Sequence, residues 1–187
     1  MKRIVIFASG SGTNAENLIK FFHNRETGSV IQVLTNNPRA KVLERAKNLN
    51  VSALSFNRIA FSQTDDVLNI LKASKPDLIV LAGFLWKFPE HILNAFPNKV
   101  INIHPALLPK YGGKGMYGHF VHEAVVNNKE AETGITIHFV NEHYDEGAII
   151  FQAKCIVEPT DTADNVAAKI HELEMEHFPK VVEKLLV

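Results

Sequence analysis

The sequence predicts an α/β protein with a doubly wound, mostly parallel sheet and antiparallel strands in its C-terminal half. Short β-branched apolar runs alternate with segments of helical periodicity through the first hundred residues. Glycine and polar residues follow several of these runs directly, at the strand ends where open parallel sheets bind ligands. Beyond residue 132, two strand-like runs are separated only by a short polar stretch, which is typical of antiparallel neighbours.

The elements can be assigned in order along the chain. Apolar runs that end in a turn signal or a polar residue predict strands at 3–8, 30–35, 51–56, 76–84 and 99–104. Helical spacing predicts helices at 12–24, 40–50 and 62–74, the last capped by Ser62 or Thr64. The remainder predicts a Pro- and Gly-rich loop at 105–118, a helix at 119–127, strands at 133–140 and 147–158, and a helix at 162–187 in which Pro179 starts a turn or a kink.

Composition restricts the class of protein. The 187 residues are expected to form one domain, and the 20 Lys and Arg balance the 20 Asp and Glu, so no bulk charge favours nucleic acid or an anionic membrane. A single cysteine, Cys155, gives no internal disulfide. The apolar run after the basic start is too short for a signal peptide, and no stretch is long enough to span a bilayer. A cytoplasmic protein is therefore expected.

A glycine loop joins the first strand to the first helix. Its spacing, Gly10-x-Gly12-x-x-Ala15, is that of the relaxed dinucleotide fingerprint, and its position offers the N–H groups of a helix N-terminus to an anion. The second strand, however, ends in residues 34–37 without the carboxylate that would hold a ribose hydroxyl. A single phosphate is therefore the preferred ligand, and a tight turn without a ligand is the alternative.

A polar pair marks the end of the strand at 99–104. Asn102 and His104 are two residues apart, so their side chains project to one face of the sheet. An amide beside an imidazole can stabilise a developing oxyanion, and the imidazole can also move a proton near neutral pH. Asp145, in the polar segment between the last two strands, could raise the pKa of that imidazole. The structural alternatives are a satisfied polar pair and a simple acidic turn.

Other candidate residues carry weaker signals. His119, His122 and His143 lack a cysteine cluster or a zinc-binding spacing, so no metal site is expected. Phe84, Trp86 and Phe88 either line a slot for a flat ligand or fill the core, and their pattern favours the core.

Five motifs together resemble one family. They are "NIHPALLPKY" (102–111), "TGITIHFVNEHYDEGAIIFQ" (133–152), "SGSGTN" (9–14), "LAGF" (81–84) and "EHFP" (176–179). In order and spacing the chain resembles, from end to end, the phosphoribosylglycinamide formyltransferases of folate-dependent purine synthesis. It departs from them at 110–118, where "KYGGKGMYG" is longer than the usual loop, and at Trp86, where a basic or aliphatic residue is common.

The resemblance implies roles for particular residues. Asn102, His104 and Asp145 would be catalytic, with His104 held protonated by Asp145. Gly12, Thr13, Asn14 and Glu176 would bind the ribonucleotide. The residues implied in folate binding are Arg58, Leu85, Trp86, Lys87, Phe88, Asn102, Asn141 and Asp145. Residues 1–100 would then form the phosphate-binding half of a single domain, and 101–187 the catalytic and folate-binding half.

The implied reaction transfers a formyl group from 10-formyltetrahydrofolate to the amine of 5'-phosphoribosylglycinamide, without a metal or a covalent enzyme intermediate. Small molecules would be the only partners of a monomer or homodimer. Another folate-dependent formyltransferase and a formyltetrahydrofolate hydrolase are the alternatives, although the nucleic-acid-binding or regulatory domains that they carry are not expected in 187 residues. A nucleotide-binding sensor would not need the three catalytic residues together.

Overall fold

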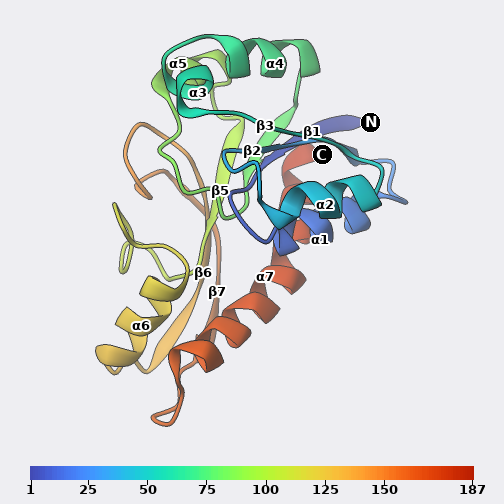
Figure 1. Cartoon of the computed structure of the whole chain (residues 1–187). Helices are drawn as coiled ribbons and strands as arrows, with labels where there is room; N and C mark the ends of the chain where they lie inside the picture. The colour runs from blue at the N-terminus through green and yellow to red at the C-terminus, as the bar shows by residue number, and fades with distance from the viewer.

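The computed structural model describes residues 1–187, and its centre is one seven-stranded sheet (Figure 1). The strands lie in the order β3-β2-β1-β4-β5-β6-β7. Their bounds are β1 Lys2–Phe7, β2 Gly28–Thr35, β3 Ser52–Ser55, β4 Leu78–Leu81, β5 Val100–His104, β6 Glu132–Phe139 and β7 Ile149–Ile156.

The first five strands are parallel, whereas β6 and β7 are antiparallel to their neighbours, as the sequence predicts. The chain leaves β1 toward β2 and β3, then returns to place β4 on the other side of β1. This reversal creates a switch point between β1 and β4, where the two following loops diverge and leave a crevice.

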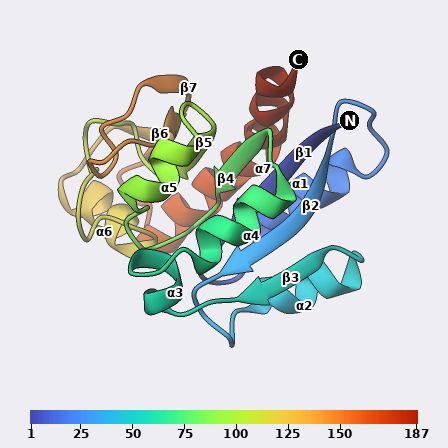
Figure 2. The ribbon, with the colours of Figure 1, turned by 90° about the horizontal axis from the view of Figure 1, so that it is seen from above.

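Helices cover both faces of the sheet. Their bounds are α1 Thr13–Phe22, α2 Lys41–Asn48, α3 Arg58–Ser62, α4 Asp66–Ser74, α5 Glu90–Ala95, α6 His119–Asn127 and α7 Ala163–Leu186. Alternate residues of β1 point to opposite faces: Ile4 and Ile6 enter a core shared with α1, α2, α6 and α7, while Val5 and Phe7 enter a core shared with α3, α4 and α5. Figure 2 shows α4 and α5 on one side of the sheet and α7 on the other.

Three local features differ from the sequence prediction. The helix predicted at 62–74 starts later, as α4 at Asp66, and α3, which ends at Ser62, was not predicted as a helix; the Thr64 hydroxyl, between the two, donates to Asp66 (2.6 Å), so neither Ser62 nor Thr64 is a cap. The helix α5 follows β4 and was not predicted. Pro179 lies inside an unbroken α7. No helix has the length and apolar character needed to cross a membrane.

Candidate active site

The loops after β1 and β4 are bonded together at the switch point. The amide of Ser9 donates to the carbonyl of Gly83 (3.0 Å), and the amide of Leu85 donates to the Ser9 hydroxyl (2.9 Å). The two loops therefore form one rigid base beneath the carboxyl ends of the parallel strands.

Gly12 shapes the turn from β1 into α1. Its φ of 76° lies in the left-handed region, and a Cβ at this position would lie 2.3 Å from Cγ2 of Val42. Only glycine lets the chain turn this tightly against α2. The turn directs the free N–H groups at the start of α1, including those of Thr13 and Asn14, to the same end of the sheet as β4 and β5.

A cleft of about 790 Å³ opens above this base, a volume ordinary for a small-molecule site. Its walls combine the glycine loop, the end of β5, the loop 113–118 and one face of α7. Gly12, Thr13, Asn14, Leu85, Asn102, His104 and Asp145 all line it. The predicted phosphate loop and the three predicted catalytic residues therefore share one cavity.

His104 is buried at the tip of β5, only 3% exposed. Its Nε2 lies 2.7 Å from the carbonyl of Tyr111, and its Nδ1 lies 3.6 Å from Oδ2 of Asp145. Because a carbonyl can only accept, Nε2 carries the hydrogen, and in the neutral ring Nδ1 presents its lone pair.

Burial lowers the pKa of His104 below its ordinary value, although Asp145 and the Tyr111 carbonyl act in the opposite direction. In the unliganded protein, burial therefore opposes the protonation of His104 that the resemblance implies. Loss of hydration outweighs the attraction of a carboxylate that stands beyond hydrogen-bond distance.

Asp145 is held from three sides. It adopts a left-handed φ of 56°, and its Oδ2 accepts the amide of Gly113 (2.9 Å). Burial raises the pKa of Asp145, but the neighbouring His138 and His104 rings and the Gly113 amide lower it by more, so the pKa falls overall. Asp145 is therefore ionised at neutral pH.

His138 belongs to the site, although the sequence analysis did not identify it. It pairs with Asn102 in the register of β5 and β6, and it is only 2% exposed. Its Nε2 lies 3.2 Å from Nδ2 of Asn102 and 3.6 Å from Oδ1 of Asp145. The signal was available in the alternation of 133–140, which leaves a histidine on a strand facing Asn102.

The acidic residue of α7 that faces the cleft is Glu174, and the assignment of Glu176 requires correction. Glu176 is exposed and pairs with Lys180 at 3.3 Å, outside the cleft. Glu174, two residues earlier on the other side of the helix, lines the cleft and accepts from Nδ2 of Asn14 (2.9 Å). Burial raises the pKa of Glu174, despite opposing contacts with Asn14 and His171.

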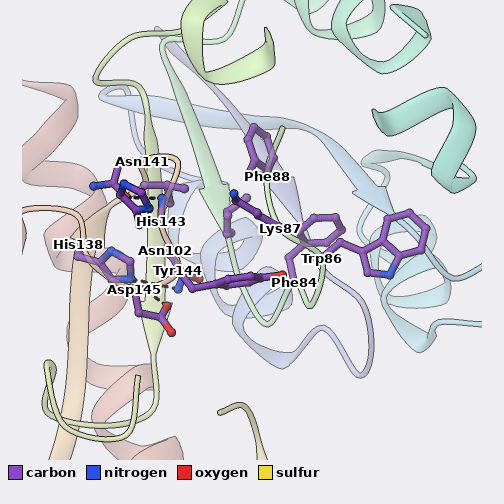
Figure 3. Close-up of a pocket in the computed structure, with 12 residues that line it drawn as sticks. Phe84, Trp86, Lys87, Phe88, Asn102, His138, Asn141, His143, Tyr144 and Asp145 are labelled. Carbon is purple, nitrogen blue, oxygen red and sulfur yellow. Dashed lines mark hydrogen bonds and ion pairs between the residues drawn. The ribbon is translucent and has the colours of Figure 1, made fainter. Parts of the chain in front are cut away.

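A second, smaller cavity of about 60 Å³ adjoins the cleft, as a slot between the β4–α5 loop and the segment 141–145 (Figure 3). Trp86, Lys87, Phe88, Asn141 and His143 line only this slot. Four residues line both cavities: Phe84, Asn102, Tyr144 and Asp145. The slot and the cleft therefore meet at the candidate catalytic residues.

Two predicted slot residues lie elsewhere. Leu85 faces the larger cleft. Arg58 stacks on the ring of Trp86, with Cζ 4.8 Å from the ring centroid, and does not line the slot. The Trp86 ring packs near the core residues Phe56 and Phe61, and Trp86 also lines the slot.

The remaining candidate histidines have different surroundings. His119 pairs with Glu123 on α6 at 3.2 Å, whereas His122 is buried and lines the cleft. No group of three or more His, Cys, Asp or Glu side chains is arranged to hold a metal ion.

Comparison with known proteins identifies relatives over the whole fold. The family model described as formyl transferase matches residues 2–182. A phosphoribosylglycinamide formyltransferase of Haemophilus influenzae is 36% identical over 98% of this chain and 86% of its own length. A chloroplastic phosphoribosylglycinamide formyltransferase of Arabidopsis thaliana is 34% identical over 97% of this chain, which spans only 64% of that protein.

A solved structure gives the same result. Glycinamide ribonucleotide transformylase 1 from Geobacillus kaustophilus superposes with a TM-score of 0.90, at 33% identity and with complete coverage of both chains. The doubly wound sheet with antiparallel β6 and β7 is therefore the fold of these enzymes as well.

Proposed function

Because the chain belongs to the formyl transferase family, we propose that it transfers a formyl group from 10-formyltetrahydrofolate to the amine of 5'-phosphoribosylglycinamide, in purine (IMP) biosynthesis. One observation carries this proposal: Asn102 and Asp145 line both the cleft and the adjoining slot. An amine acceptor in the cleft and a formyl donor in the slot would meet at these two residues, and much of the rate acceleration would come from this proximity.

The ribonucleotide is assigned to the larger cleft. Its phosphate accepts from the free N–H groups of Thr13 and Asn14 at the start of α1, in the turn that Gly12 permits. Glu174 holds the ribose or the amine, since its buried carboxylate faces the same cleft and is oriented by Asn14. This arrangement places the amine near the end of β5.

The formyl oxygen is assigned to Asn102. Attack by the amine converts the formyl carbon to a tetrahedral centre and its oxygen to an oxyanion. His138 accepts one hydrogen of the Asn102 amide group, which fixes the orientation of the side chain and leaves the second hydrogen for that oxygen. Loss of such a donor typically lowers turnover by about 10²–10³.

His104 is assigned as the proton carrier. In the neutral ring, Nε2–H is engaged by the Tyr111 carbonyl, so the lone pair of Nδ1 is free to accept a proton from the attacking amine. The imidazolium that results stands beside Asp145, whose negative charge stabilises it. The proton then passes to the nitrogen that leaves. In this proposal Asp145 stabilises the positive charge of the His104 ring during the reaction, rather than in the resting protein.

The folate is assigned to the slot. Trp86, Lys87 and Phe88 form one wall, and Asn141 to Asp145 form the other, with Asn102 at the base. Leu85 contributes from the cleft side, and Arg58 acts through its stacking on Trp86.

The test is an absorbance assay for the deformylated folate product, run with and without glycinamide ribonucleotide. We expect product only when the acceptor is present, and loss of turnover in His104→Ala. In Thr13→Ala, which keeps the backbone N–H but removes the hydroxyl of this cleft-lining residue, we expect mainly a higher KM for the ribonucleotide. Product formed without the acceptor would identify a hydrolase, and no product under either condition would reject the enzyme assignment.

A further inference from the structure

The charges of the cleft are unusual for a site that receives a phosphate. Among all the residues that line it, Lys114 is the only lysine or arginine. The cleft also contains two carboxyl groups, those of Asp145 and Glu174. A phosphate carries nearly two negative charges at neutral pH, and Lys114 is the only lining residue with a permanent positive charge, since the other residues that can become cations are His104, His122 and His171.

Lys114 is free to serve in this way. Its side chain is exposed and makes no hydrogen bond or ion pair, whereas the nearby Lys110 is paired with Glu130 at 3.1 Å. An ammonium group that lines a cavity without an acidic partner is available to an anionic ligand without first breaking a contact.

The backbone around Lys114 gives it room to move. Gly113 and Gly115 flank it with φ values of 95° and 91°, and a Cβ built at either glycine would meet no atom within 4 Å. The lysine is thus flanked by two glycines with open space beside them, which allows its side chain to approach a ligand without displacing the core.

The same segment is joined to the catalytic residues. The Tyr111 carbonyl accepts from Nε2 of His104, and the Gly113 amide donates to Asp145. A contact made by Lys114 is therefore one residue away from the amide that holds Asp145.

We propose that Lys114 binds the substrate phosphate from the side of the cleft opposite the start of α1, closing the 113–118 segment over the ribonucleotide. The assignment rests on the proposed function for the identity of the substrate. The glycine loop supplies neutral N–H donors, and Lys114 supplies the full positive charge that the rest of the cleft lacks.

The experiment compares Lys114→Met and Lys114→Arg with the unaltered protein. Lys129→Met is the matched control, because Lys129 is also exposed and without a side-chain partner but lies outside the cleft. Calorimetry with ribose 5-phosphate measures binding. Steady-state kinetics compare glycinamide ribonucleotide with the corresponding nucleoside, which lacks the phosphate.

In Lys114→Met, we expect affinity for ribose 5-phosphate to fall, and the KM for the ribonucleotide to rise, by about 10- to 100-fold, the loss of one charge-assisted hydrogen bond. Lys114→Arg should retain most of the affinity, Lys129→Met all of it, and the nucleoside should be used equally by all four proteins. An unchanged affinity in Lys114→Met, or equal losses with and without the phosphate, would overturn the proposal.

The two hypotheses fail in different ways. If the unaltered protein does not turn over the ribonucleotide, the proposed function fails, while calorimetry with ribose 5-phosphate still tests Lys114. If the unaltered protein is active and Lys114→Met binds ribose 5-phosphate equally well, only the role of Lys114 fails.

Discussion

Asn102 and His138 face each other across β5 and β6, with Nδ2 of the amide 3.2 Å from Nε2 of the ring. The other ring nitrogen, Nδ1, lies 2.8 Å from the carbonyl of Phe139 and must donate to it. In the neutral ring this leaves Nε2 as an acceptor for Asn102. A backbone carbonyl at the end of β6 thus determines, through one histidine, which way the Asn102 amide points.

Replacing His138 should therefore impair turnover mainly through the lost orientation of Asn102. In His138→Ala we expect kcat to fall about 10-fold, against about 10²–10³ in Asn102→Ala, because the amide remains but is no longer oriented. The KM for the ribonucleotide should change little, since the phosphate loop is untouched. Steady-state kinetics of both variants provide the measurement, and a His138→Ala enzyme with unchanged kcat would show that Asn102 needs no such support.

The dependence of activity on pH tests the assignment of His104 as a base. Burial lowers the pKa of His104, so kcat/KM should be constant near neutrality and decline only below about pH 6.5, the ordinary histidine value. Asp145 raises that pKa, so Asp145→Asn should lower it further. We expect the acidic decline to move to lower pH while turnover in the plateau falls about 10²-fold.

The measurement is a pH–rate profile of both proteins, supported by NMR titration of the His104 ring. A His104→Gln variant, which cannot titrate, should lack the acidic decline altogether. Movement of the decline to higher pH in Asp145→Asn would contradict the charge interaction between the two residues.

Most of the fold was predictable because apolar periodicity records burial directly. Strands buried on both faces, such as β1 and β4, appear as continuous apolar runs, and α6 was predicted with its observed bounds. The helix α3 was not predicted, because five residues are too few to show a helical period. The start of α4 at Asp66 was placed too early for a similar reason: a local contact of Thr64 with Asp66, rather than periodicity, marks that end of the helix.

The site was predictable where two residues share one strand and less so where it depends on packing. The two-residue spacing of Asn102 and His104 placed them together. The choice between Glu174 and Glu176 depends on which side of α7 packs against α1, and neighbouring acids on a helix do not reveal this. The protonation of His104 depends on its burial, which no sequence motif reports.

Gly12 should be far less tolerant of a methyl group than Gly10, although both lie in the glycine loop. Gly12→Ala would bring Cβ within 2.3 Å of Val42 and force alanine into a left-handed φ, so we expect a loss of about 2 kcal/mol or more in the free energy of unfolding. Gly10→Ala meets no atom within 4 Å and should lie within about 0.5 kcal/mol of the unaltered protein. Urea unfolding of both variants measures the difference, and equal losses would contradict the close packing of the turn on α2.

The ionised carboxylate of Glu174 should lower the stability of the fold while it helps to bind the ribonucleotide. Burial raises the pKa of Glu174, so folding favours the protonated form. This contribution to the free energy of unfolding is present below pH 4.5, the ordinary pKa, and is lost as the pH rises through the higher pKa of the folded protein. Glu174→Gln keeps the acceptor for Asn14 but never ionises. We therefore expect a higher unfolding temperature than that of the unaltered protein at pH 8, and no difference near pH 4, where Glu174 is itself protonated.

The same variant should bind the ribonucleotide less well, with a KM about 10-fold higher, because the carboxylate that faces the ribose or the amine has lost its charge. Thermal unfolding at both pH values and steady-state kinetics test the two effects together. Glu176→Gln is the matched control, since Glu176 is exposed outside the cleft and should change neither quantity. If Glu176→Gln raised the KM and Glu174→Gln did not, the acid assigned to substrate binding would have to be reversed, and α7 would have to present its other side to the ligand.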